Sequence, residues 1–193
     1  MLPSLLTLTL LLLTVVNGLL VYSIASPDRR IWPPPAQQTW QYYFVWVPTL
    51  LSFLLFIVIG VADWNSLSWP ALIRWPIGVV LIVVGNLLAW GGVWQFGLKK
   101  TSGAEGSLVT TGMYRYSRNP QYVGDICTLV GWIVLSASAW AIPAVLAGVL
   151  AFVLAPFAEE SWLGEIHGDD YREYVKQTPR FFCLLYTSPS PRD

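Results

Sequence analysis

The chain has 193 residues, of which 55% are hydrophobic and only 11% are charged, and its formal net charge is zero. A soluble domain carries about 25% charged residues, so this composition excludes an ordinary soluble protein. The neutral charge balance also gives no basis for binding nucleic acid, which requires a basic surface. We therefore expect an integral membrane protein in contact with membrane lipids.

Three uncharged stretches in the first half of the chain are long enough to cross a bilayer, which takes about 20 apolar residues. They are Leu2–Ala25, Trp40–Ala62 and Pro76–Leu98. No basic residue precedes the first stretch, and its positive charges, Arg29 and Arg30, follow it. This polarity predicts a retained helix with the N-terminus outside rather than a cleaved signal peptide.

A fourth apolar stretch, Tyr122–Ala158, contains Asp125 as its only charged residue. As one helix it would be about 55 Å long, whereas the hydrocarbon core of a bilayer is about 30 Å thick. The segment Ser136–Pro143 predicts a break, which makes the stretch a tight hairpin of two short helices. The fold class that follows is all-α, with about five transmembrane helices and a short helical cytoplasmic tail.

The distribution of Lys and Arg predicts the orientation. With the N-terminus outside, the ten Lys and Arg residues before position 183 divide into nine cytoplasmic residues and one outer residue, Arg74, which satisfies the positive-inside rule. Lys99 and Lys100 belong to the cytoplasmic group. The loop before the fourth span and the tail after the fifth are therefore expected on the same face, and together they form one candidate site.

The loop segment Tyr114–Gly124, YRYSRNPQYVG, gathers polar and aromatic groups at the predicted start of the fourth helix. Asn119 can accept a hydrogen bond from a free backbone N–H there, and Pro120 suits the first helical position. With Arg118 beside this helix start, the segment could hold a carboxylate or phosphate. Three tyrosines add rings for stacking and hydroxyls for hydrogen bonds: Tyr114, Tyr116 and Tyr122. Ordinary anchoring at the membrane interface explains the same residues, so the segment alone leaves both interpretations open.

The tail Ala158–Phe182 begins where the fifth helix is expected to leave the membrane. Glu159 and Glu160 stand at this exit, and such a pair is more often solvated or salt-bridged than catalytic. Gly168 predicts an interruption of the helix. A second short helix is expected to follow, with Asp169 as its cap, Lys176 in its last turn, and Tyr171, Tyr174 and Val175 on one face.

The remaining polar residues give weaker signals. Asp125 lies in the first turns of the fourth helix, where an ionisable group is costly and often functional, although the helix dipole would also explain it. Asn86 and Gln95 are candidates for hydrogen bonds between helices. We expect His167 at the surface and no metal site, and Cys127 and Cys183 support neither a disulfide framework nor a metal cluster.

Together the two polar segments resemble the isoprenylcysteine carboxyl methyltransferase family and its relatives, the phospholipid methyltransferases. The first family motif, Gly-x-Tyr-x-x-x-Arg-His-Pro-x-Tyr-x-Gly, is matched by Gly112, Tyr114, Arg118, Asn119, Pro120, Tyr122 and Gly124. The second motif is matched by Glu159, Glu160, Leu163, Gly168, Tyr171, Tyr174, Pro179, Arg180 and Phe181. Asn119 replaces the usual His, so a role of that imidazole cannot be carried over, because an amide does not titrate near neutral pH.

The resemblance implies one integral membrane methyltransferase domain over residues 1–182, with cofactor-site segments 108–124 and 158–182. It implies S-adenosylmethionine as the methyl donor, bound on the cytoplasmic side, and a lipophilic acceptor that enters from the bilayer. The acceptor stays open among an isoprenylcysteine carboxylate-like molecule, a phospholipid and a small hydrophobic molecule. The residues expected to position donor and acceptor are Arg118, Glu159 and Glu160. The residues expected to bind the cofactor are Tyr114, Arg118, Asn119, Pro120, Tyr122, Gly124, Glu159, Tyr171 and Tyr174.

Two other functions remain open at this point. The NADPH-dependent membrane sterol and steroid reductases share an Arg-His-x-x-Tyr-x-Gly segment, often followed by an acid, and Asp125 fits that pattern. The Glu159–Glu160 pair favours the methyltransferases instead. A non-catalytic scaffold, in which the motif residues only anchor helices, is the other alternative. The last eleven residues, Cys183–Asp193, resemble a translated transposase-type adapter sequence, and we expect them to be a non-native tail.

Overall fold

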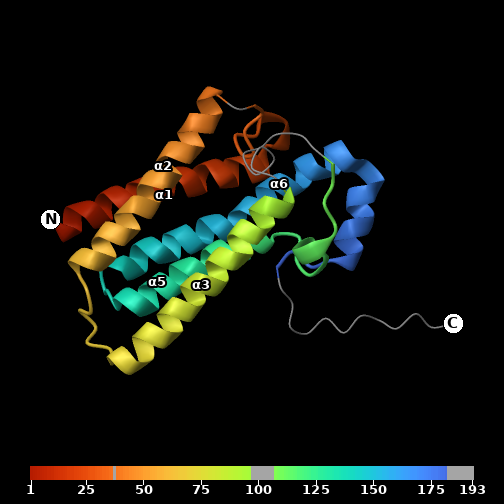
Figure 1. Cartoon of the computed structure of the whole chain (residues 1–193). Coiled ribbons are helices and arrows are strands. Elements are labelled where there is room, and N and C mark those ends of the chain that lie inside the picture. Colours follow the sequence, from red (N-terminus) through yellow and green to blue (C-terminus); the bar gives the residue numbers. More distant parts are fainter. Residues whose placement is uncertain (37, 97–106, 182–193) are drawn as a thin grey trace.

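The computed structural model describes residues 1–36, 38–96 and 107–181, and within these ranges the chain is helical, with no strand (Figure 1). The α-helices are α1 (Leu2–Ala25), α2 (Trp40–Ala62), α3 (Ala71–Phe96), α5 (Pro120–Ser136) and α6 (Ala141–Gln177). Two short 3-10 helices, η1 (Pro27–Arg29) and η2 (Gly112–Arg115), lie in the connecting loops. The all-α prediction is confirmed for the described part of the chain. The predicted residues Lys99, Lys100, Phe182 and Cys183–Asp193 lie outside it.

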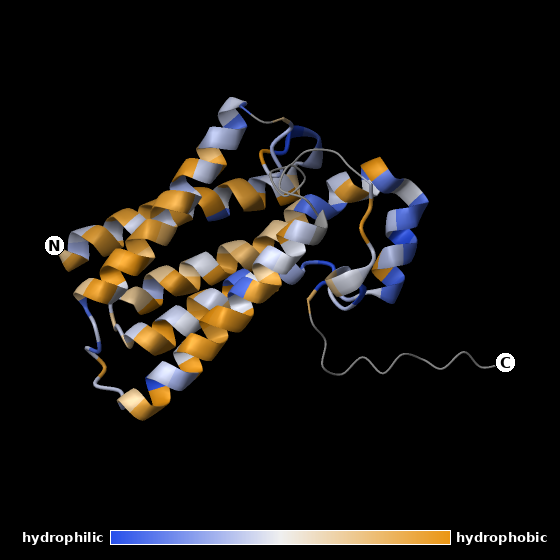
Figure 2. Cartoon of the chain, in the orientation of Figure 1, coloured by the Kyte–Doolittle hydropathy of each residue, from blue (hydrophilic) through white to orange (hydrophobic). Residues whose placement is uncertain are grey.

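Four of the described helices, α1, α2, α3 and α6, are long and apolar enough to cross a membrane. Figure 2 shows hydrophobic residues along these helices and hydrophilic ones in the last part of α6, beyond its bend. The chain is therefore a multi-pass membrane protein. Helix α5 has 17 residues, about 26 Å at 1.5 Å per residue, and its crossing stays a prediction.

The predicted bounds of α1 and α2 agree with the structure, but the predicted start of the third helix at Pro76 is wrong. Helix α3 begins at Ala71 and passes through Arg74, the charge that suggested a later start. The side chain of Arg74 is buried. Its Nη1 donates a hydrogen bond to the carbonyl of Leu135 (2.8 Å), and its guanidinium lies over the ring of Trp64 (4.7 Å). These two contacts allow the cation to lie within the helix, although its Nε–H has no partner among the described residues.

The chain turns between α5 and α6 within residues 137–140, inside the segment where a break is predicted. Asp63, at the end of α2, fixes this turn by accepting hydrogen bonds from the hydroxyl of Ser138 (2.7 Å) and the backbone N–H of Trp140 (3.1 Å). Desolvation opposes ionisation of Asp63, but the hydrogen bonds from Ser138 and Ser66 outweigh it and hold its pKa below the ordinary value. The end of α2 thus sets where α6 begins.

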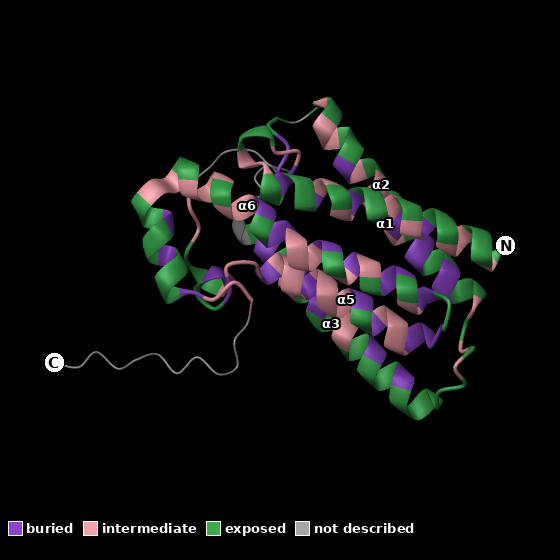
Figure 3. Ribbon diagram, turned by 180° about the vertical axis from the view of Figure 1, so that it is seen from behind, coloured by how far each residue is buried: buried purple, intermediate pink, exposed green. Residues whose placement is uncertain are grey.

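Helix α3 lies along α5, while α1 packs on both α2 and α6 (Figure 1). Buried residues line the faces between the helices, and exposed ones cover their outer faces (Figure 3). Small residues let α3 and α5 approach closely: a Cβ on Gly124 would meet the backbone of Gly85 and Ala89. Asn86 forms the predicted bond between helices, donating to the hydroxyl of Thr128 (3.3 Å). The side chain of Gln95 lies outside the described part.

We predict that Gly124→Ala destabilises the protein by about 1–3 kcal/mol, because the added methyl group overpacks the contact between α3 and α5. Thermal unfolding in nanodiscs, followed by circular dichroism, measures the change. Gly18→Ala is the matched control, since a Cβ on Gly18 meets nothing within 4 Å. Equal unfolding temperatures for the two variants would contradict the packing role of Gly124.

Candidate functional site

The structure brings the start of α5 and the C-terminal tail together at one end of the helices. Gly168 has φ 54° and ψ −125°, so it breaks α6 as predicted and turns the chain back toward α5. The backbone N–H of Arg118 donates to the carbonyl of Pro179 (2.9 Å), and the hydroxyl of Ser117 donates to the carbonyl of Arg180 (3.2 Å). The two motif segments are thus in direct contact.

Helix α5 begins at Pro120, as predicted, but the predicted capping hydrogen bond of the Asn119 side chain is wrong. Asn119 occupies the N-cap position without a side-chain cap bond, and its amide Nδ2 donates to the carbonyl of Arg180 (3.1 Å). The tail offers this carbonyl beside the helix start, and only the NH₂ group of the amide can donate to it. Asn119 therefore holds the tail rather than capping the helix.

Glu160 is the centre of an ionic network that links α5, α6 and the tail. Its Oε1 accepts from Nη1 of Arg118 (2.9 Å) and from Nε of Arg180 (2.7 Å), while its Oε2 accepts from Nη2 of Arg180 (2.7 Å). The hydrogen bond to Glu160 raises the pKa of Arg180 above its ordinary value. Arg180 also lies over the ring of Phe157 at 3.8 Å. Its role was missed at the sequence level, although the Pro-Arg-Phe ending of the second motif contained the signal.

Glu159 points to different partners from those of its neighbour. Its Oε1 accepts a hydrogen bond from the indole Nε1 of Trp32 (2.8 Å) and a short one from the hydroxyl of Tyr122. Sequence reasoning missed Trp32, which lies in the loop between α1 and α2. The only available signal was that this loop is predicted on the same face of the membrane as the tail.

Three tyrosines of the motifs, Tyr114, Tyr171 and Tyr174, form a buried cluster. The hydroxyl of Tyr174 donates to the backbone carbonyl of Tyr114 (2.6 Å), which ties the tail to η2. Burial, and secondarily the charge of Glu159, raise the pKa of Tyr114 above its ordinary value, so this phenol keeps its proton at neutral pH. Val175, which is predicted on the same face of the short helix, and Tyr116 are both exposed.

A cavity of about 390 Å³ connects this polar cluster to the apolar interior, a volume within the range of small-molecule sites. Seven predicted site residues line its polar end: Tyr114, Arg118, Asn119, Tyr122, Glu159, Tyr171 and Tyr174. Its apolar end is lined from α1, α2 and α6 by Leu13, Val16, Val45, Phe53, Phe56 and Phe152. Pro120, Gly124 and Glu160 do not line it, and their predicted contact with a ligand stays a prediction.

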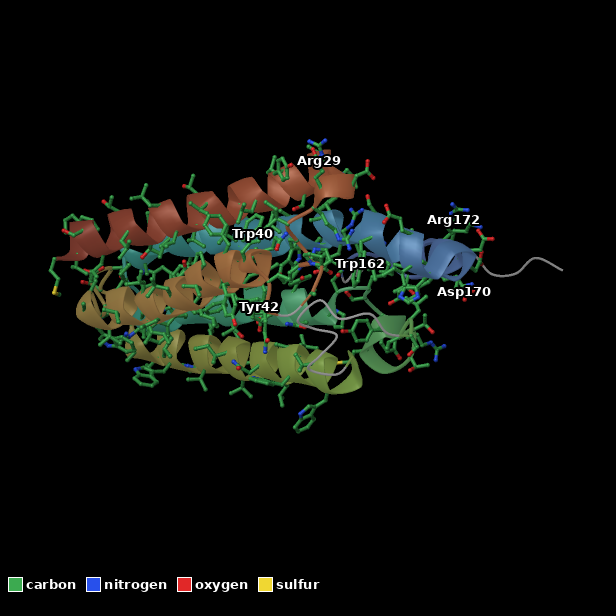
Figure 4. The ribbon with its side chains drawn as sticks, turned by 90° about the horizontal axis from the view of Figure 1, so that it is seen from above. Arg29, Trp40, Tyr42, Trp162, Asp170 and Arg172 are labelled. Atoms are coloured by element: carbon green, nitrogen blue, oxygen red, sulfur yellow. The ribbon has the colours of Figure 1, made fainter. Side chains whose placement is uncertain are left out.

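The cavity is also lined by residues of α2 and α3 that lie at the outer surface. Two of its lining residues, Leu50 of α2 and Trp90 of α3, are 61% and 56% exposed, so they face both the cavity and the apolar outer surface. Trp162 of α6 also lines the cavity and lies toward the middle of the molecule. Asp170 and Arg172, in the last part of α6, lie farther out (Figure 4).

Comparisons with known proteins agree with the motif segments. The phospholipid methyltransferase family matches residues 73–170, which run from α3 to the turn after Gly168. The nickel-cobalt-cadmium resistance protein NccN of Alcaligenes xylosoxydans xylosoxydans is 30% identical over 146 residues, which are 73% of this chain and 64% of that protein. The cobalt-zinc-cadmium resistance protein CzcN of Cupriavidus metallidurans is 33% identical over 150 residues, 73% of this chain and 63% of that protein. The chain therefore spans less than two thirds of these relatives, and no solved structure matches it significantly.

We predict that Arg180→Ala loosens the tail, because hydrogen bonds to a charged group contribute about 1.5–3 kcal/mol. The N–H of Arg118, which donates to Pro179, should then exchange with solvent at least about tenfold faster in hydrogen-exchange mass spectrometry. Arg172→Ala is the control, because the Arg172–Asp169 pair is mostly exposed and contributes little. Unchanged exchange at Arg118 in the Arg180 variant would show that the ionic network does not hold the tail.

Proposed function

The chain belongs to the phospholipid methyltransferase family, and from this premise we propose that it transfers a methyl group from S-adenosylmethionine to a lipophilic acceptor. One observation carries the proposal: both motif segments converge on a cavity that is polar at one end and apolar at the other. A water-soluble donor and a membrane-dissolved acceptor need such a division of one site.

The residues at the polar end fit the chemical groups of S-adenosylmethionine. The side chain of Arg118 is only 9% exposed and lines the cavity, and its guanidinium group suits the carboxylate of the donor. The free N–H groups at the start of α5 suit the same anion. The carboxylate of Glu159 suits the amine or the ribose hydroxyls, and the tyrosine rings suit the adenine.

When bound, S-adenosylmethionine would supply an electrophilic methyl group, so the main task of the protein is to orient the reactants. Glu160 and Arg180 hold the tail against α5 and thereby fix the guanidinium of Arg118 at the cavity. Trp32 and Tyr122 hold the carboxylate of Glu159 at the same end. The tyrosine cluster separates this end from water. We therefore propose an indirect role for Glu160, and we propose Arg118 and Glu159 as residues that contact the donor.

We propose that the acceptor enters from the bilayer between α2 and α3, because Leu50 and Trp90 line the cavity and are also exposed on the outer surface. We propose five membrane crossings with the N-terminus outside, which puts the polar end of the cavity on the cytoplasmic side. Isoprenylcysteine carboxylate-like molecules, phospholipids and small hydrophobic molecules all fit an apolar cavity of this kind. The names of the two relatives refer to metal resistance, which we do not extend to this chain.

We predict that the full chain in nanodiscs binds S-adenosylmethionine, and that Arg118→Ala weakens this binding at least about tenfold, because a charge-assisted bond to a carboxylate is lost. Calorimetric titration measures both affinities. Arg115→Ala is the control, since Arg115 lies in the same loop but is exposed and does not line the cavity. Circular dichroism confirms that each variant is folded.

NADPH is titrated in parallel to separate the methyltransferases from the membrane reductases. Binding of NADPH alone would overturn the proposal in favour of a reductase. Equal affinities of the wild type and the Arg118 variant for S-adenosylmethionine would return Arg118 to the role of an interface anchor. A folded wild type that binds neither compound would favour the non-catalytic scaffold.

A further inference from the structure

Asp125 is the charged residue of the cavity that the site described above does not use. It lies on α5 four positions after Gln121 and three after Tyr122, and all three side chains line the cavity. Three residues correspond to about 4.5 Å along a helix, so Asp125 lies one turn deeper than Tyr122, toward the apolar end. It therefore stands between the proposed donor end and the part of the cavity that suits an apolar tail.

The position of Asp125 excludes the helix dipole as its explanation. Helix α5 begins at Pro120, which makes Asp125 its sixth residue. The stabilisation of an acid by the dipole falls off within the first turn. The carboxylate is also without a hydrogen bond or an ion pair to any residue that the structure describes, and it borders apolar residues of α2 and α6. An ionisable group in such surroundings is costly unless something pairs with it.

The other charges of the cavity do not offer Asp125 a partner. Three charged side chains line the cavity: Arg118, Asp125 and Glu159. Arg118 is paired with Glu160, and Glu159 accepts hydrogen bonds from Trp32 and Tyr122. Two of the three lining charges, Asp125 and Glu159, are negative, and Asp125 is the unpaired one. A carboxylate-bearing head would be repelled there, whereas a cationic head would be attracted.

A second group of the cavity also lacks a partner. Trp46 of α2 lines the cavity, and its buried indole Nε1–H makes no hydrogen bond among the described residues. An unpaired donor in an apolar wall costs free energy unless a ligand accepts from it. This N–H is enclosed in the wall and is not exposed to the cavity, so the unpaired carboxylate of Asp125 is the group that calls for a polar head on the molecule that fills it.

We propose that Asp125 binds the acceptor and selects one with a protonated amine on an apolar tail over one with a carboxylate, an inference that rests on the proposed methyltransferase function. The ammonium pairs with Asp125 and passes a proton to its carboxylate, which frees the nitrogen lone pair. The nitrogen then forms a bond to the methyl carbon, while the bond from that carbon to the donor sulfur breaks and its electron pair stays on sulfur. A second proton leaves the methylated nitrogen only if the product is released as the neutral amine. Asp125 is therefore both a binding group and the proton acceptor.

The test uses the full chain in phosphatidylcholine nanodiscs, with dodecylamine, dodecanol and dodecanoate as probes that share one tail length. Calorimetry against empty nanodiscs gives the affinity for each probe, and methyl transfer from labelled S-adenosylmethionine to dodecylamine gives kcat/KM. We expect the wild type to bind dodecylamine at least about tenfold more tightly than dodecanol or dodecanoate. Asp125→Asn should abolish this preference and lower kcat/KM, while the affinity for S-adenosylmethionine stays unchanged. Glu165→Gln, which removes an exposed acid outside the cavity, should preserve both.

Equal binding of the amine and the carboxylate by the wild type would overturn the inference, and so would an Asp125→Asn variant that keeps the preference. If Asp125→Asn does not fold, Asp125→Glu decides, because it keeps the charge and should keep the preference for the amine. Loss of the preference in a folded Asp125→Glu variant that still binds S-adenosylmethionine would count against charge pairing. A wild type that fails to bind S-adenosylmethionine overturns the methyltransferase proposal instead, so the two failures are distinguishable.

Discussion

The carboxylate of Glu160, shared between Arg118 and Arg180, is the interaction on which the site depends. It joins a residue at the start of α5 to one in the tail, and these lie 42 and 20 positions away from Glu160 in the sequence. Two guanidinium groups this close would repel each other without the carboxylate between them. With it, the cluster keeps one net positive charge beside the positive end of the α5 dipole. The same contact that closes the tail over the site thus makes its polar end attractive to an anion.

The charged residues of the cavity follow one another in a fixed order from its polar end toward its apolar end. This order suits two substrates of different solubility. The polar end has Arg118 and the helix start, then Glu159 held by Trp32 and Tyr122, and one turn deeper the unpaired Asp125. Beyond it the walls are apolar, and the lining residues Leu50 of α2 and Trp90 of α3 are also exposed on the outer surface. A charged donor has no favourable place in the apolar part, and an alkyl chain has none among the charges. Under the proposed function, each molecule would be directed to one end, and their reactive groups would meet between the two ends.

The sequence predicts those features of the fold that depend on local chemistry. Long apolar runs define α1 and α2, Pro120 starts α5, and Gly168 breaks α6 because it adopts a positive φ. The sequence does not predict features that depend on contacts between residues far apart in the chain. The predicted start of α3 is too late because nothing local indicates that Leu135 and Trp64 contact Arg74. Trp32 and Arg180 were missed as site residues for the same reason: their partners, Glu159 and Glu160, lie on another element.

Asn119 shows how a departure from a family motif can keep one physical role and drop another. The motif has a His at this position, which can donate a hydrogen bond and can also change its charge near neutral pH. The amide of Asn119 donates to the carbonyl of Arg180 and so joins Ser117 and the backbone of Arg118 in holding the tail. An amide does not titrate, so this contact is equally strong across the physiological pH range. In this chain the residue before Pro120 therefore holds the tail, and it neither accepts nor releases a proton near neutral pH.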